Sequence, residues 1–372
     1  MSIGHERARV HRRIREELLP RVRALVQTTE AKARVFFAAT IVSCLVVLTG
    51  LIWAAITLRI AELGVVEFVV LLATLVVLGA TLQGLFHLIF VRGARRHYHQ
   101  QIVIPLMAIV DDRTAPASSP DWARREFERS NLSQLPTHRL HTTPAFTLKM
   151  DNGNPLYIAE VEAVCRVSTL DDLQQRKRES FAARGLFFAA RIPGLSPGTT
   201  AVAPSLRRFT NAEELPRATA PPGLKAPPIR PAESWPQISW LPDNDPHDLH
   251  AVEIADPEFR AYFDVWSDDT ARARALLRSP ARPHLKRTHT LWRADAHRSA
   301  ITRTEGQGYF LILWRDETLY LYRPTFCLSH EMQAFDLAEQ ARLMAHFAQE
   351  VRLCLDLMEV LVETASNWHG RL

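Results

Sequence analysis

Cysteine is scarce in this chain of 372 residues. It occurs four times, with no Cys-x-x-Cys pair and no spacing typical of a zinc site, at Cys44, Cys165, Cys327 and Cys354. Three of the four follow residue 91, and an odd number argues against a disulfide framework in that region. The sequence therefore excludes a zinc-ribbon or disulfide-stapled fold and favours a reducing compartment.

Most of the chain also lacks an excess of positive charge. Of its 45 basic and 40 acidic residues, ten and six lie in residues 1–91, which leaves 35 and 34 for the remainder. The net charge of +5 is therefore a local property of the N-terminal part. Because nucleic-acid binding needs a basic patch or stripe, the sequence predicts no nucleic-acid partner.

Two long hydrophobic runs are present, and the rest of the chain is organised around them. Residues 35–58 and 68–91 are each 24 residues long and contain no Asp, Glu, Lys or Arg. A helix of this length extends about 36 Å, which crosses the hydrocarbon core of a bilayer with some tilt. Nine residues separate the runs, so we expect a transmembrane helical hairpin over residues 35–91.

Basic residues predict the orientation of this hairpin. The arm 1–34 holds nine Arg or Lys, and three arginines closely follow residue 91, whereas the loop 59–67 has one arginine. Positive residues favour the cytoplasmic side. We therefore expect a multi-pass protein of the inner (plasma) membrane with both termini in the cytoplasm.

The arm itself predicts a short basic helix. Val10, Ile14 and Leu18 recur every fourth residue among arginines, and the pattern ends at Pro20. Such a helix can dock on anionic lipid headgroups, or it can serve only as a topology signal. Both interpretations name the lipid bilayer as a partner.

Within the second run, Gln83 and His87 lie four residues apart and therefore on one helix face. A histidine inside a membrane can relay protons or bind a ligand. The interpretation that we favour is a hydrogen bond between the two helices over the small residues nearby.

Residues 92–372 predict an α+β cytoplasmic domain, a mixed α/β fold with antiparallel hairpins and a long C-terminal helix. A helix is expected over 95–110 with an interruption at Pro105, a short one over 122–130, one capped near 267–269, and a long one over 331–367. A short strand is expected to begin at 291–292. Alternating apolar residues or strand-forming runs predict strands over 145–150, 156–167, 185–192, 200–203, 259–265, 309–314 and 318–322. Between them, residues 211–250 hold nine prolines and predict a long exposed insert, and residues 113–120 predict a linker.

The same patterns predict how the core is built. The strands 145–150 and 156–167 are expected to form one hairpin, and the strands 309–314 and 318–322, apolar on both faces, a second and central one. The apolar stripe of the helix 331–367 is wider than a coiled-coil seam, so we expect this helix to lie against the sheet that contains 309–322. Arg352 and Glu359 flank the stripe and are expected to tolerate substitution.

Several segments of this domain resemble one protein family. They are ARRHYHQQIVIPL, YIAEVEAV, RGLFFAARIPG, DPEFRAYFDVWSDDTARARALL and YFLILWRDETLYLYRP. The chain resembles the bacterial membrane proteins grouped as domain of unknown function 3137. What the resemblance implies is architecture, since no activity and no catalytic residue come with it.

One segment matches a catalytic motif by spelling. Residues 194–198 read G-L-S-P-G, like the nucleophile elbow of hydrolases, which places its serine between a strand and a helix. The residue after Ser196 is Pro197, which has no N–H to offer an oxyanion. The segment that follows predicts a strand, so we interpret residues 193–198 as a hairpin turn and Ser196 as non-catalytic.

Metal-ligand patterns are similarly weak. Two His-x-x-His pairs lie beside prolines, at His138/His141 and His247/His250, and His97 and His99 flank a tyrosine. Acidic doublets at 111–112, 171–172 and 268–269 are better explained, in the first and last cases, as a helix end and a helix cap. The sequence assigns no catalytic residue, no metal ligand and no cofactor.

Two functions therefore stay open. The first is a non-catalytic, membrane-tethered binding or sensing module with an unidentified protein partner. The alternative is a membrane-bound, hydrolase-like enzyme whose active site the sequence does not reveal. A concave pocket with converging acidic or histidine side chains would favour the enzyme, and a flat apolar patch would favour the binding module.

Overall fold

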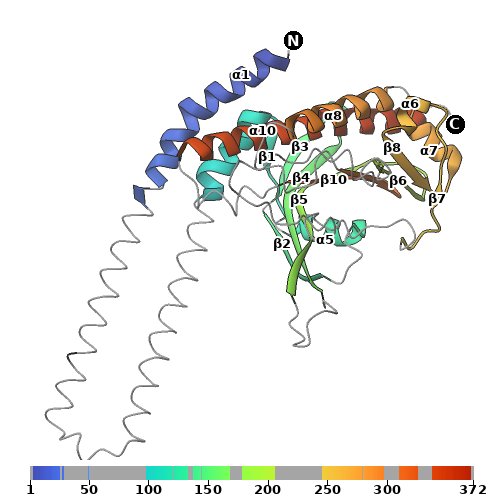
Figure 1. Ribbon diagram of the computed structural model, residues 1–372, viewed down its shortest axis with the longest axis horizontal. Helices are drawn as coiled ribbons and strands as arrows, with labels where there is room; N and C mark the ends of the chain where they lie inside the picture. The colour runs from blue at the N-terminus through green and yellow to red at the C-terminus, as the bar shows by residue number, and fades with distance from the viewer. Residues whose placement is uncertain are drawn as a thin grey trace, which may run out of the picture. The chain divides into compact units, whose positions relative to one another are not determined.

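The fold is given by a computed structural model (Figure 1). It describes residues 3–25, 27–28, 49, 98–119, 121–132, 137–143, 145–167, 178–205, 245–278, 280–296, 310–325 and 337–369. The two apolar runs, apart from residue 49, and most of the insert 211–250 lie outside these residues. Among the residues that are described, no helix is both long and apolar enough to cross a membrane.

The chain divides into two compact units, Met1–Ile109 with Phe335–Ala345, and Val110–Ala334 with His346–Leu372. In the first unit, helix α1 (Ile3–Arg13) leads into the π-helical segment η1 (Ile14–Leu18). The helix then continues past Pro20 to residue 25. The expected end at Pro20 is therefore wrong.

The π-helical turn explains how the helix continues. A proline lacks an N–H, and its ring crowds the carbonyl four residues earlier. In η1 the N–H of Leu19 bonds to the carbonyl of Ile14, five residues back, which widens the turn just before the proline. The segment η3 (His99–Val103) does the same before Pro105, so the predicted interruption of helix α4 (Ile104–Val110) is also wrong.

The apolar stripe of the arm is buried. Ile14, Leu18 and Val22 are at most 1% exposed, and the arginines at 9, 12, 15, 21 and 23 are exposed. An apolar face that is buried in protein cannot insert between lipids. The exposed arginines are then the residues of the arm best suited to contact anionic lipid headgroups.

In the second unit, ten strands of the described residues form one antiparallel sheet. The order is β1 (Thr114–Pro116), β3 (Phe146–Lys149), β4 (Pro155–Val167), β5 (Arg178–Arg191), β10 (Thr318–Pro324), β9 (Leu311–Arg315), β6 (Thr199–Pro204), β8 (Phe263–Ser267) and β7 (His250–Ala251), with β2 (Thr137–Thr142) also paired to β4. The predicted hairpins β3–β4 and β9–β10 are confirmed, and the second one lies at the centre. Gly153, with φ +83°, supplies the left-handed backbone of the first turn.

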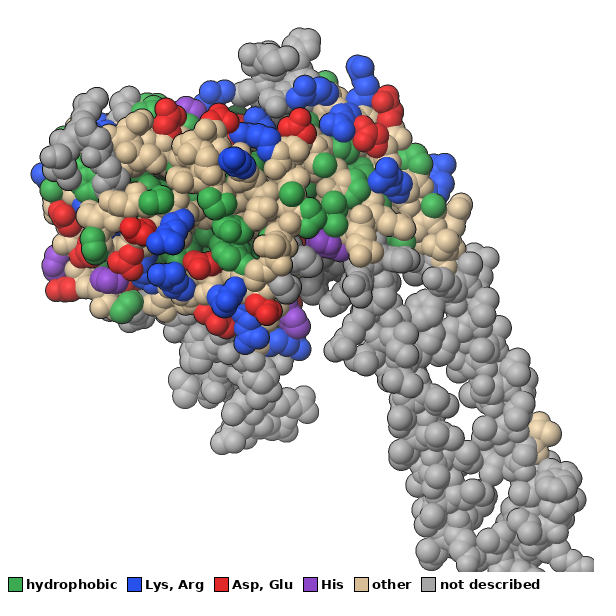
Figure 2. Space-filling model, turned by 180° about the vertical axis from the view of Figure 1, so that it is seen from behind, with side chains coloured by type: hydrophobic (Ala, Val, Ile, Leu, Met, Phe, Trp, Pro, Cys, Tyr) green, Lys and Arg blue, Asp and Glu red, His purple; other side chains and the backbone are tan. Residues whose placement is uncertain are grey.

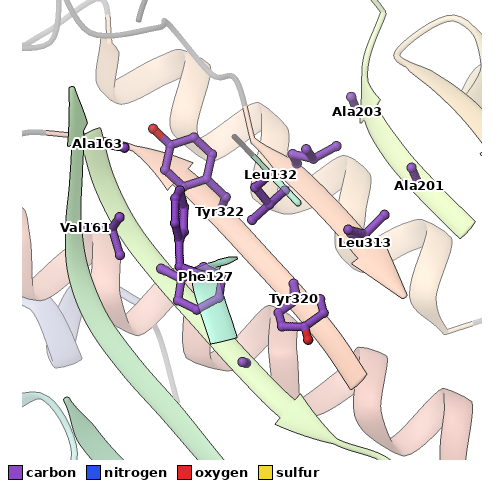
Figure 3. Packing of buried hydrophobic residues seen from close by; sticks show 12 residues of the cluster. Phe127, Leu132, Val161, Ala163, Ala201, Ala203, Leu313, Tyr320 and Tyr322 are labelled. Carbon is purple, nitrogen blue, oxygen red and sulfur yellow. The ribbon is translucent and has the colours of Figure 1, made fainter. Parts of the chain in front are cut away.

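One face of the sheet packs under helix α5 (Trp122–Ser130) (Figure 3). Phe127 of this helix meets Phe187 edge to face, with ring centroids 5.5 Å apart. The other members of the cluster come mostly from alternate positions of neighbouring strands: Leu132, Val161, Ala163, Ala189, Ala201, Ala203, Leu311, Leu313, Tyr320 and Tyr322. In Figure 3 the hydroxyls of Tyr320 and Tyr322 point in opposite directions along β10.

The opposite face is covered by α8 (Ala281–Ala296) and by the part of α10 (Leu337–His369) that belongs to this unit. Arg323 of β10 donates from Nε to Oε2 of Glu350 on α10 at 2.8 Å. Its guanidinium carbon also lies 4.7 Å from the ring centroid of Trp292 on α8. These contacts confirm the prediction that the long helix lies against the central hairpin.

The buried stripe of α10 is wide, as its sequence predicts. Phe347, Val351 and Met358 are at most 2% exposed. Further buried positions widen the stripe beyond a two-position coiled-coil seam: Ala348, Cys354, Leu355, Leu357, Leu361, Val362 and Ala365. In this unit the helix is a core element.

Three local expectations are wrong. Residues 291–292 belong to helix α8, because Trp292 packs inward against Phe310 at 4.9 Å between ring centroids. The expected strand 259–265 is a helical turn, α6 (Pro257–Arg260), followed by β8, since Asp256 caps the N–H of Phe259. The expected linker 113–120 contains the edge strand β1.

The connection from β5 to β6 is not a hairpin. The two strands are separated in the sheet by β10 and β9, so residues 192–198 cross the end of the central hairpin. Backbone bonds fasten this loop to the β9–β10 turn, from Ile192 N–H to the Glu317 carbonyl and from Asp316 N–H to the Gly198 carbonyl. The alternation of apolar and polar residues within a single strand does not indicate that β9 and β10 lie between β5 and β6.

Candidate functional site

A groove of about 520 Å³ lies between α5 and the neighbouring ends of β4, β5 and β10. All of its described lining residues belong to the second unit. The lining residues are Trp122, Glu126, Arg129, Pro155, Tyr157, Ala189, Arg191, Asp316, Glu317 and Thr318. Its volume is within the range usual for sites that bind small molecules or short peptide segments.

The sheet register creates the floor of the groove. Tyr157 on β4 pairs with Ala189 on β5, and Ala189 pairs with Tyr320 on β10. Arg191 and Thr318 form the next pair on the same face. Ala189, which carries only a methyl group, lies between the two tyrosines and lines the groove.

Two stacked aromatic rings form one wall. Trp122, the first residue of α5, lies over Tyr157 with ring centroids 4.1 Å apart and planes inclined by 15°. Both side chains are partly exposed and line the groove. Stacked aromatic side chains offer a rigid surface that a planar or cationic group can contact.

Glu126 stands one helical turn after Trp122 and forms the polar part of the same wall. The hydroxyl of Tyr320 donates to its Oε2 at 3.1 Å, and Nη1 of Arg129 lies 3.9 Å from its Oε1. Burial raises the pKa of Tyr320, and the charge of Glu126 raises it further. Tyr320 therefore acts as a fixed hydrogen-bond donor at neutral pH.

The β9–β10 turn forms the opposite rim. Asp316 occupies the left-handed position, with φ +49°, and its carboxylate accepts a hydrogen bond from the N–H of Gly198 at 3.3 Å. Glu317 accepts from Nη2 of Arg191 at 2.9 Å and from the N–H of Gly194 at 3.1 Å. These two bonds lower the pKa of Glu317 and keep it ionised.

Gly198, the second glycine of the G-x-S-x-G match, has a structural role. A β-carbon at this position, where φ is +126°, would lie 2.5 Å from Nη1 of Arg272 and 2.8 Å from Oδ1 of Asp268. Only glycine allows the loop to pass so close to the buried arginine. The chain after Ser196 continues as strand β6 and not as a helix, so this segment does not have the hydrolase arrangement.

The other predicted candidates do not come together. His141 lies on the edge strand β2, and His247 lies 3.8 Å from Asp268, while His250 is 71% exposed. Gln83, His87 and His97 lie outside the described residues. Within the described part of the chain, no group of three His, Cys, Asp or Glu is placed to hold a metal ion.

The acidic doublets have structural roles where they are described. Asp269 caps helix α7 (Thr270–Leu276) by accepting from the N–H groups of Ala271 and Arg272. Ser267, which we expected as the cap, instead bonds to the N–H of Asp269 at 3.1 Å. The doublet 171–172 lies outside the described residues.

Asp111 follows α4, as expected for a helix end, and it is the centre of an ion-pair network. It accepts from Arg113 at 2.8 Å and from Arg352 of α10 at 3.2 Å, and Arg113 also reaches Glu359 at 2.7 Å. Burial raises the pKa of Asp111, but the two arginines outweigh this and lower it. The network joins the start of the second unit to α10.

The groove was not predicted from the sequence. Trp122, Glu126, Tyr157 and the turn at 316–318 lie in three separate segments, and each segment has an ordinary pattern. One available signal was the pair of neighbouring acids in the β9–β10 turn. Another was the single aromatic residue at the start of the short helix.

The space-filling view shows Lys, Arg, Asp and Glu side chains interspersed over one face of the molecule (Figure 2). No large area of one sign is visible among the described residues on this face. This distribution matches the near neutrality of the domain sequence.

Comparisons with known proteins give one match. Neither a search of curated proteins nor a search of solved structures returned a match. Residues 182–362 match the model of a family described as a protein of unknown function, DUF3137. The matched range includes Ala189, Arg191 and the β9–β10 turn of the groove. It begins after Trp122, Glu126 and Tyr157, which lie outside it. The resemblance noted in the sequence is thereby confirmed over residues 182–362, which match the DUF3137 family model, whereas the segments ARRHYHQQIVIPL and YIAEVEAV lie outside the matched range.

Proposed function

We propose that this protein is a bacterial, membrane-tethered binding or sensing module whose groove beside α5 takes a ligand on the cytoplasmic side. The apolar runs 35–58 and 68–91 and the surrounding arginines support the tether and the orientation. The groove, with its aromatic wall and charged rim, is the observation that carries the binding function.

A second function is a membrane-bound enzyme, and one observation favours it. Three carboxylates, from Glu126, Asp316 and Glu317, line the groove, which is the kind of pocket expected of an enzyme. Two features favour binding instead. Glu317 is already paired and ionised, whereas a general acid needs a raised pKa, and the described part of the lining holds neither cysteine nor histidine.

The binding function can be tested by photocrosslinking of the full chain in native membranes. The photoreactive residue p-benzoylphenylalanine replaces Thr318 in the groove or, as a control, Glu128 on the outward side of α5, where it pairs with Arg124. We expect a discrete crosslinked product at position 318 that is missing at position 128. Identical products at both positions, or none at either, would contradict the proposal.

The enzyme is distinguished by turnover. Purified full-length protein is incubated with ester, phosphoester and peptide substrates, and the Glu126→Gln variant is compared with Glu128→Gln. We expect no turnover in any sample. Turnover that disappears only in Glu126→Gln would replace the binding function with catalysis.

A further inference from the structure

The groove carries an excess of negative charge. Its described lining contains three carboxylates and two guanidinium groups. One guanidinium, that of Arg191, is held by Glu317 at 2.9 Å. The other, that of Arg129, is 66% exposed and lies 3.9 Å from Glu126, which is a long distance for an ion pair. Solvent therefore screens much of the attraction between the two charges. A ligand in the groove therefore meets Glu126, whose nearest cation is exposed to solvent, and Asp316, which shares the buried guanidinium of Arg272 with Asp268 and Asp269.

The aromatic wall stands directly beside one of these carboxylates. Trp122 and Glu126 are four residues apart on α5 and so share one face of the helix. The ring faces of tryptophan and tyrosine attract cations, and a guanidinium plane also stacks on them. Trp122 and Tyr157 each cover one ring face of the other, so a planar cation at this wall would contact an outer face or an edge and could donate hydrogen bonds to Glu126 at the same time.

The carboxylate of Glu126 is held in position. The Tyr320 hydroxyl fixes its Oε2, and Tyr320 is itself a buried core residue that is 1% exposed. A fixed acceptor loses little conformational entropy when a ligand binds. The groove volume of about 520 Å³ is larger than a single cation needs and leaves room for the adjoining backbone.

We propose that the groove binds an arginine side chain of a peptide partner, with its guanidinium stacked on the Trp122–Tyr157 wall and hydrogen-bonded to Glu126. This inference rests on the proposed binding function and names the chemistry of its ligand. Arginine fits better than lysine, because a guanidinium is planar and can bind a carboxylate with two parallel bonds.

The test uses the full chain in detergent micelles, labelled with 5-fluorotryptophan. The ¹⁹F resonance of Trp122 is assigned by its loss in Trp122→Phe. Two capped pentapeptides serve as probes, with a central arginine or its neutral isostere citrulline among alanines. We expect the arginine peptide to shift the Trp122 resonance at concentrations at least tenfold lower than the citrulline peptide.

Matched variants locate the interaction. Glu126→Gln should raise the concentration for half-maximal shift at least tenfold, and Glu128→Gln, two residues away and directed outward, should leave it unchanged. The remaining tryptophan resonances report whether each variant keeps its fold. Equal shifts by both peptides, or an arginine response that Glu126→Gln does not weaken, would overturn the proposal.

Failure of this inference differs from failure of the proposed function. If position 318 crosslinks a ligand but arginine and citrulline peptides behave alike, the groove binds something other than a cationic side chain. If neither experiment gives a signal, both the inference and the binding function fall.

Discussion

At the scale of single residues, the ion pair between Arg323 and Glu350 is buried in the protein core. The two side chains are 4% and 1% exposed, and a second bond between them measures 3.4 Å. A buried pair of this kind contributes little compared with an apolar pair of the same volume. Removing one partner is different, because the other charge stays buried and loses its oppositely charged partner.

Glu350→Ala should therefore lower the free energy of unfolding by roughly 3–5 kcal/mol. The measurement is urea denaturation of the full chain in detergent, followed by tryptophan fluorescence. Arg323→Met combined with Glu350→Leu should recover most of the loss, since both charges are removed together. A single variant as stable as the wild type would show that water reaches Arg323.

At the scale of elements, the burial of the apolar face of helix α10 was predicted from the sequence, and the ion pairs of its polar face were not. Its apolar stripe follows from spacings of three and four residues, and Phe347 is 2% exposed. Its polar side was expected to tolerate substitution at Arg352 and Glu359. The structure instead places these residues in the network around Asp111, where Arg352 approaches a carboxylate that is 4% exposed.

Phe347→Ala should destabilise the protein by roughly 3–5 kcal/mol, because it removes a buried ring and leaves a cavity. Glu363→Ala, at an exposed position of the same helix, is the matched control and should change stability by less than about 0.5 kcal/mol. Denaturation midpoints and sedimentation are measured together. If Phe347→Ala dissociated an oligomer without moving the midpoint, the helix would be an interface and not a core element.

Elements with a local signal were predictable, and their arrangement was not. The β3–β4 turn contains Asn152 and Gly153, and β9–β10 is apolar on both faces, so both hairpins follow from neighbouring residues. The place of β10 beside β5, and of β9 beside β6, depends on pairings between distant segments. The groove depends on the same distant pairings, and so no local pattern could indicate it.

At the scale of the whole molecule, the sequence predicts a membrane orientation that the described residues do not test. Positive residues flank the apolar runs on both outer sides, and the loop 59–67 is nearly free of them. This asymmetry predicts that the loop faces the outside and that the insert 211–250 faces the cytoplasm.

Single cysteines at Ala61 and Asn211, in a chain whose four native cysteines are replaced, test this orientation. A membrane-impermeant maleimide should label the residue at 61 in intact cells. Position 211 should react only after the inner membrane is opened. Labelling of position 211 in intact cells would reverse the topology and place the groove outside.

The insertion of β9 and β10 between β5 and β6 also sets the order in which the sheet can be completed during synthesis. Strand β6 (199–204) is synthesised before its partner β9 (311–315). Strand β5 is likewise synthesised before its partner β10 (318–324). At about 5–20 residues per second, the 120 residues between 204 and 324 take roughly 6–24 s to be made. For that interval two strands have unpaired edges, so a ribosome that stalls there releases a chain with exposed backbone donors and acceptors. The central hairpin is thus both the middle of the sheet and the last part of the sheet to be synthesised.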